Sequence, residues 1–233
     1  MKTRIIQPEP ELEPGSAAAA EAWTPIAEER ETWLRRSIFA TAVVGYFIIG
    51  VMHPADIEVG DETTLYIGIH LVQPVLILLL AWGIWLLVKD LPGRAAQVAR
   101  VAIVPYAIAY SMFDAIAGVS LGGIVRLAND ASTADAAAVQ RLMDSGTDYV
   151  GAAIWVASGL TWFVMALAAA IAVKPIGGRG PTLLMAIGAA IFAVGHPFPP
   201  GPIGIALFGL GVAWLELRRA RAPSPEPQPV LAP

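Results

Sequence analysis

Three histidines and one buried acid carry the chemistry that this chain could perform. His70 and Asp114 are ionisable residues within long apolar stretches, and His53 and His196 each precede a proline at the end of another apolar stretch. Imidazole nitrogens bind zinc, copper or haem iron, and a histidine titrates near neutral pH. A carboxylate inside a bilayer costs about 2.5 to 3.5 kcal/mol, so it usually faces other helices. These residues are therefore candidates for a metal site or a proton relay.

A polar face interrupts the most apolar stretch of the chain, residues 64–88. His70 and Gln73 are three residues apart and share one helix face, and Pro74 has no amide hydrogen to donate to the carbonyl of His70. Such a patch is costly against lipid, so it is predicted to face the protein interior. Counted at about 1.5 Å per residue, several polar residues lie at similar depths below the outer surface. The predicted outward-opening pocket is lined by His70, Gln73, Ser111, Asp114 and Ser158.

Each of these residues also has a purely structural interpretation. His53, His70 and His196 are a possible ligand set for a divalent metal or haem, but no two of them stand at a metal-binding spacing on one helix. They are also compatible with ordinary or hydrogen-bonded residues at the membrane interface, which is the favoured interpretation. Asp114 is either a functional acid or a neutral one that ties helices together, with Tyr110 and Ser111 as donors one turn earlier.

The composition of the chain is that of a membrane protein. Of its 233 residues, 56% are hydrophobic and only 15% are charged, with a mean hydropathy of +0.63; a soluble domain has about 25% charged residues. The chain has no cysteine, which excludes disulfides and thiolate ligands. The net charge of −4 and the scattered basic residues argue against nucleic-acid binding.

Hydropathy predicts an all-α, six-helix membrane bundle within residues 31–219. Residues 1–30 are expected to form a disordered and partly amphipathic tail, and residues 220–233 a disordered proline-rich tail. Ser132 or Thr133 is expected to cap a short additional helix with Val139, Leu142 and Met143 on its apolar face. The last two spans, at about 15 residues each, would reach only about 22 Å. The predicted spans are residues 37–52, 64–88, 98–125, 149–173, 182–195 and 203–217.

The basic residues predict the orientation of the bundle. With six spans, Arg126 and Arg141 fall on one side of the membrane, and the remaining Lys and Arg residues fall on the side of the termini. Basic residues are enriched in cytoplasmic segments. Both termini are therefore predicted to be cytoplasmic, with the protein in the plasma (inner) membrane.

Three function classes remain open from the sequence. The first is a small transporter or ligand-binding bundle that uses the outward-facing pocket. The second is a metal- or haem-dependent membrane redox protein or enzyme. The third is an accessory subunit of a larger membrane complex, or a homo-oligomer, that docks through the Gly-rich third and sixth predicted helices, the third of which carries the GxxxG pair Gly118 and Gly122. The chain lacks a Walker loop, a GxSxG motif and an HExxH motif, so no motif identifies a reaction.

Overall fold

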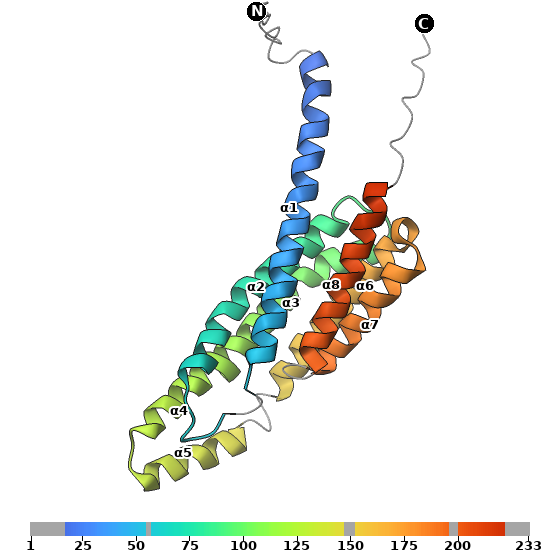
Figure 1. Ribbon diagram of the computed structural model, residues 1–233. Coiled ribbons are helices and arrows are strands. Elements are labelled where there is room, and N and C mark those ends of the chain that lie inside the picture. The colour runs from blue at the N-terminus through green and yellow to red at the C-terminus, as the bar shows by residue number, and fades with distance from the viewer. Residues whose placement is uncertain (1–16, 55–56, 147–151, 196–199, 222–233) are drawn as a thin grey trace, which may run out of the picture.

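The computed structural model describes residues 17–54, 57–146, 152–195 and 200–221, and all regular structure in these ranges is helical (Figure 1). Seven continuous helical rods result, because α3, η1 and α4 follow one another without a break. The elements are α1 (Ala17–Met52), α2 (Thr64–Val88), α3 (Arg94–Phe113), the π-helical segment η1 (Asp114–Ser120), α4 (Leu121–Asn129), α5 (Thr133–Gly146), α6 (Ala152–Gly177), α7 (Arg179–Gly195) and α8 (Pro200–Arg221).

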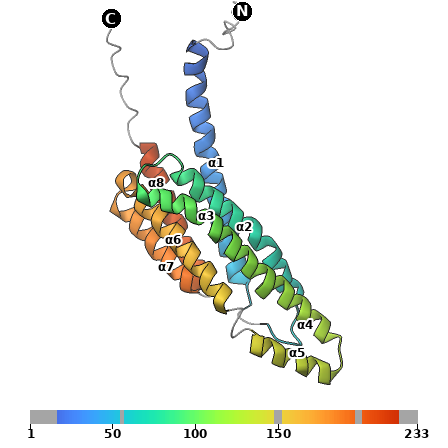
Figure 2. The same cartoon turned by 180° about the vertical axis from the view of Figure 1, so that it is seen from behind.

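Six of the rods form a closed ring. Each packs against two neighbours in the order α1, α2, α3, α6, α7, α8 and back to α1, with weaker contacts from α6 across the ring to α2 and α8. Figures 1 and 2 show that α4 and α5 lie at the end of the bundle opposite to the start of α1 and the end of α8. The ring gives the molecule one shared interior, onto which all six rods present side chains.

Five of the rods are long and apolar enough to cross a membrane. The predicted fifth span corresponds to α7, which has only 17 residues and reaches about 25 Å. α7 packs between α6 and α8, and a Cβ on its Gly188 would lie 2.4 Å from the backbone nitrogen of Phe208. This short helix is therefore held by a close backbone approach to α8.

The helix that contains the predicted last span is longer than that span. α8 has 22 residues, and the predicted apolar span has about 15. Pro200 and Pro202 lie in its first turn, where a missing amide hydrogen costs no helical hydrogen bond. At the other end, the basic residues Arg218, Arg219 and Arg221 continue the helix past the apolar segment.

Two segments outside the predicted spans are also helical. Residues 17–30, expected to belong to a tail, continue into the first span within α1. α5 is the short helix predicted after the third span, and the Ser132 hydroxyl accepts a hydrogen bond of 3.4 Å from the Asp135 amide. Its predicted apolar face is only partly correct: Met143 is buried, but Leu142 is 70% exposed. The reason is that α5 packs mainly on α4 and buries only a narrow stripe.

Hydrogen bonds join the connection between α1 and α2 to α4 and α5. The Asn129 side-chain amide donates to the Asp61 carbonyl at 2.9 Å, and the Gly60 amide donates to the Asn129 side-chain oxygen at 2.6 Å. The Val59 amide donates to the Gln140 side chain at 2.9 Å. The connection between α1 and α2 is therefore fixed to the end of α4 and to α5.

Aromatic rings fill the centre of the ring of helices. The Trp162 ring contacts Phe192 and Phe208 at centroid distances of 5.0 and 5.2 Å, and its indole nitrogen donates to the Ala189 carbonyl at 3.0 Å. Trp162 is fully buried. The fully buried aromatic residues of this centre are Tyr46, Tyr106, Tyr110, Trp162, Phe192 and Phe208.

Candidate functional site

Two of the three histidines meet at the end of the bundle that faces α4 and α5. His53 directly follows α1, and His70 lies in the second turn of α2. Their Nε2 atoms are 3.2 Å apart, and the two rings are inclined by 76°. His53 is 9% exposed and His70 is 2% exposed. The predicted inward orientation of His70 is therefore observed, and the pair is largely shielded from solvent.

The backbone fixes the protonation of both imidazole rings. The Nδ1 of His70 is 2.8 Å from the Tyr66 carbonyl oxygen, and the Nδ1 of His53 is 2.5 Å from the Pro54 carbonyl oxygen. A carbonyl only accepts hydrogen bonds, so each Nδ1 must carry the donated proton. In the neutral rings, both Nε2 atoms then present lone pairs, and these lone pairs face each other across 3.2 Å. A proton or a metal cation between them is needed to remove the repulsion.

The surroundings of His53 favour the neutral ring. Burial lowers the pKa of His53 from its ordinary value, an effect that the hydrogen bond to the Pro54 carbonyl only partly opposes. A neutral imidazole is the form that binds metals. His53 is thus favoured in the form that can act as a ligand.

The geometry of the pair fits a metal ion. Zinc–nitrogen bonds are about 2.1 Å long, and two such bonds to atoms 3.2 Å apart enclose an angle of about 100°, close to a tetrahedral angle. Hydrogen bonds from the other ring nitrogen to backbone carbonyls are typical of histidines that ligate metals. Within the described ranges, no third histidine, aspartate or glutamate joins the pair. His196, the third predicted ligand, lies outside the described residues.

The same distance argues against a haem held between these two histidines. Two axial ligands of one haem iron lie on opposite faces of the macrocycle. Nitrogens 3.2 Å apart leave no room for a porphyrin plane between them. Of the two predicted cofactors, the pair therefore fits a single metal ion and not a bis-histidine haem.

The π-helical segment η1 packs directly beneath the pair. The His70 ring lies against Gly118, where a Cβ atom would be 2.1 Å from the ring atoms Cγ and Cδ2. The Tyr66 hydroxyl donates to the Ala117 carbonyl at 2.6 Å. Short π-helical segments often occur at functional sites, because their wider turn displaces side chains and carbonyls from α-helical positions.

The prediction that Gly118 and Gly122 form a docking face is wrong. Both glycines are buried against α2 of the same chain, and a Cβ on Gly122 would lie 2.6 Å from Cγ1 of Ile67. The small residues do permit a close helix approach, as the GxxxG spacing suggested. However, α2 already occupies this face, so it is not open to a partner or to a second copy of the chain.

Asp114 lies at the start of η1 and is fully buried. Neither of its carboxylate oxygens has a hydrogen-bond partner within the described part of the chain. The hydroxyls of Tyr46, Tyr106 and Tyr110 lie within electrostatic range of the carboxylate. An ionised carboxylate without donors is strongly disfavoured in an apolar interior, so a proton or a bound cation would stabilise Asp114.

The tyrosines around Asp114 were only partly foreseen. Tyr110 was predicted as a neighbour, whereas Tyr46 and Tyr106 were missed. The signal for Tyr106 is present in the sequence, since Tyr106, Tyr110 and Asp114 follow one another at intervals of four residues and therefore share a helix face. Tyr46 comes from α1, and no spacing along the chain relates it to Asp114.

The remaining predicted pocket residues are less closely associated. Gln73 and Ser158 are each 1% exposed, so both face the interior as expected. The Ser158 hydroxyl, however, donates to the Trp155 carbonyl of its own helix at 2.8 Å. Ser111 is half-buried, and its backbone carbonyl accepts from the Asp114 amide. The structure therefore separates these residues into two polar groups, the histidine pair and the surroundings of Asp114, rather than five converging side chains.

Comparison with known proteins adds no assignment to this geometry. No protein-family model matches the chain, and no similar curated protein or solved structure is found. The functional argument therefore depends on the residues themselves.

Proposed function

We propose that this protein is a small membrane-embedded bundle that binds a divalent transition-metal ion, such as Zn²⁺, between His53 and His70. The observation that carries the proposal is the pair of facing Nε2 atoms at 3.2 Å, each on a ring whose Nδ1 donates to a backbone carbonyl. Imidazole is a favoured ligand for zinc, copper and nickel. The pair supplies two ligands, and His196 and water are proposed for the remaining positions.

The proposed site lies toward the outer side of the inner membrane. The basic residues support this orientation, because Arg126 and Arg141 are the only ones in the described ranges that lie toward the α4–α5 end. With α7 counted as a sixth, short crossing, both termini are cytoplasmic. Metal ions would then reach His53 and His70 from outside, past the acidic residues of the connections at that end.

Zinc binding by the purified protein in detergent tests this proposal. After removal of metal with a chelator, wild type is expected to bind one Zn²⁺ per chain, and His70→Ala and His53→Ala are each expected to weaken binding more than about 100-fold. Tyr66→Phe is the matched control, because it removes only the hydroxyl and keeps the backbone carbonyl that holds His70. His196→Ala tests the third ligand.

Two results would contradict metal binding. One is a wild-type protein that binds Zn²⁺ no more tightly than the double variant His53→Ala/His70→Ala. The other is an equal loss in Tyr66→Phe, which would indicate a general disturbance of α2. If the protein binds no metal and purifies with another membrane protein, the role of accessory subunit is favoured instead.

Cation transport is a second candidate function, favoured by Asp114. This acid lies one turn deeper than Gly118, against which His70 packs, and its oxygens have no protein donor in the described residues. A transporter would pass a metal ion or a proton from the histidine pair to this group. In proteoliposomes, wild type should then take up Zn²⁺ and Asp114→Asn should not, although both bind the ion. Equal uptake by the two proteins would limit the function to binding.

A further inference from the structure

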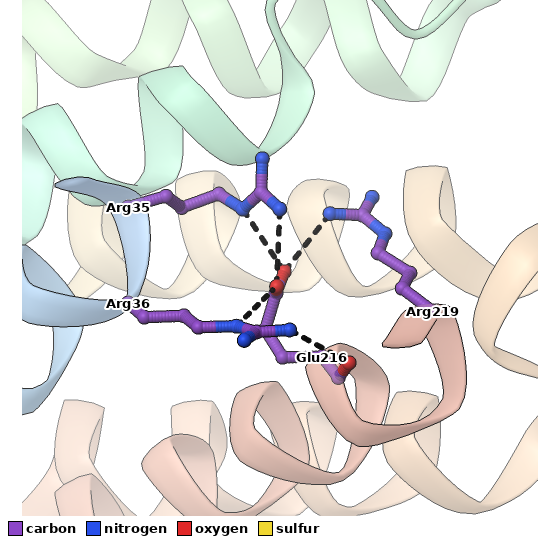
Figure 3. A network of polar contacts seen from close by, with 4 residues as sticks. All are labelled: Arg35, Arg36, Glu216 and Arg219. Atoms are coloured by element: carbon purple, nitrogen blue, oxygen red, sulfur yellow. Dashed lines mark hydrogen bonds and ion pairs between the residues drawn. The ribbon is translucent and has the colours of Figure 1, made fainter. Parts of the chain in front are cut away.

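At the end of the bundle that carries the start of α1 and the end of α8, three arginines converge on one carboxylate (Figure 3). Arg35 binds both oxygens of Glu216 at 2.9 and 3.0 Å. Arg36 donates to the same carboxylate at 3.3 Å, and Arg219 donates to it at 3.0 Å. One negative charge thus faces three positive charges, in a site where the Glu216 side chain is only 7% exposed.

The arginines retain donors for a further acceptor. Each guanidinium has five N–H donors, and the hydrogen bonds to the Glu216 side chain and carbonyl use only a minority of them. Arg36 and Arg219 keep 46% and 24% of their side chains exposed. Arginine donors in this arrangement are suited to a phosphate group.

A cavity of about 500 Å³ opens beside this cluster. Its acidic lining residues other than Glu216 are Glu31 and Asp90, and both are paired with Lys89 at 3.0 and 3.2 Å. The four cationic groups at the cavity therefore exceed the three acidic ones by one charge, and the excess lies on the arginine side. The cavity favours an anion next to Arg36 and Arg219.

An apolar groove of about 360 Å³ continues from the same point between α1 and α8. It shares Arg36 and Glu216 with the polar cavity and then runs past Phe39, Val43 and Ala213. From Arg36 to Val44, the lining of α1 extends over eight helical steps, or about 12 Å along the helix. A charged cavity thus leads directly into an apolar channel on the outside of the bundle.

We infer that this composite site binds one anionic phospholipid, with its phosphate at Arg36 and Arg219 and one acyl chain in the α1–α8 groove. Trp33 and Trp214, which are 68% and 41% exposed at this end, are placed where tryptophans contact lipid headgroups. A soluble phosphate would use the arginines but not the groove. The inference requires α1 and α8 to lie in a bilayer and does not depend on the proposed metal site.

Native mass spectrometry of the detergent-purified chain tests this inference. The protein is incubated with phosphatidylglycerol or with phosphatidylcholine of the same acyl chains. Wild type is expected to retain the anionic lipid preferentially. Arg36→Gln should reduce its retention roughly fivefold, the equivalent of about 1 kcal/mol for one arginine at an anionic surface. Arg221→Gln, which removes the same charge from an exposed position that lines neither cavity, is the matched control.

A second variant separates the lipid from a free anion. Ala213→Phe fills the groove without touching the arginine cluster, so it should reduce retention of phosphatidylglycerol and leave binding of glycerol phosphate unchanged. Ala157→Phe, at an exposed position on α6, controls for the added ring. The inference is overturned if the two lipids are retained equally, if Arg221→Gln acts as strongly as Arg36→Gln, or if Ala213→Phe has no effect on lipid retention.

Discussion

The bundle buries two carboxylates in opposite surroundings. Glu216 is 5% exposed and accepts hydrogen bonds from three arginines, whereas Asp114 is fully buried and has no hydrogen-bond partner within the described residues. A buried charge that is fully paired serves the structure, because removal of either partner leaves an uncompensated charge. A buried acid without donors contributes little to stability and is available for a proton or cation.

The groups around the two carboxylates differ in the same way. Around Glu216, charged groups hold α1 to α8. Around Asp114, the neighbours are the hydroxyls of Tyr46, Tyr106 and Tyr110, and neither carboxylate oxygen has a hydrogen-bond partner within the described ranges. The paired carboxylate is thus suited to fixing α1 against α8, and the carboxylate without donors is suited to holding a proton or a cation.

The largest effect is expected from Glu216→Gln. This change removes the negative charge that Arg35, Arg36 and Arg219 share, and breaking a buried ion pair costs about 3 to 5 kcal/mol. Thermal unfolding in detergent should show a large loss of stability. A loss below about 1 kcal/mol would show that the arginine cluster does not hold α1 to α8.

An intermediate effect is expected from Gly118→Ala. The new methyl group would lie 2.1 Å from the His70 ring, and the resulting displacement should cost about 1 to 3 kcal/mol and weaken zinc binding. Gly123→Ala is the matched control, since nothing lies within 4 Å of the added atom. If Gly118→Ala left the zinc affinity unchanged, packing of His70 against η1 would not be needed for zinc binding.

Asp114→Asn should change stability by less than about 1 kcal/mol. The substitution has nearly the same shape and removes no hydrogen bond present in the described part of the chain. Thermal unfolding of Asp114→Asn and of Glu216→Gln under the same conditions compares the same chemical change at the two buried carboxylates. A loss as large as that of Glu216→Gln would mean that Asp114 is a structural acid, and the transport proposal would fail.

The smallest effect is expected at an exposed carboxylate, Glu62. It accepts from the Thr64 amide at 2.9 Å at the start of α2, and hydrogen bonds from the Thr64 side chain and amide lower the pKa of Glu62 from its ordinary value of 4.5. Its stabilisation is therefore present above about pH 4.5 and is lost as the pH falls through the lowered pKa. Unfolding curves of wild type and Glu62→Gln should differ slightly at neutral pH and converge in acid.

The sequence predicted individual helices better than contacts between them. The inward orientation of His70, Gln73 and Asp114 followed from the cost of polar groups in lipid, which depends on each helix alone. The meeting of His53 with His70 depends on how α1 and α2 pack, and no spacing along the chain contains that information. For the same reason, Arg35 and Arg36 were used only to predict the orientation of the bundle in the membrane. Their pairing with Glu216 was missed, because Glu216 is 181 and 180 residues away from them in the chain.

The GxxxG prediction failed for a related reason. The spacing of Gly118 and Gly122 correctly indicated close helix contact, but a small-residue face does not specify which helix will use it. In this bundle α2 fills the face, with His70 against Gly118 and Ile67 against Gly122.

The wide turn of η1 sets the direction in which the side chains of α4 point, because α4 continues the same rod. Each residue of an α-helix turns the chain by about 100°, so deletion of a single residue from 114–120 would swing Asn129 to another side of α4. Asn129 would then lose its hydrogen bonds to Gly60 and Asp61, which hold the connection before α2. The register of η1 thus decides whether a connection far earlier in the chain is held.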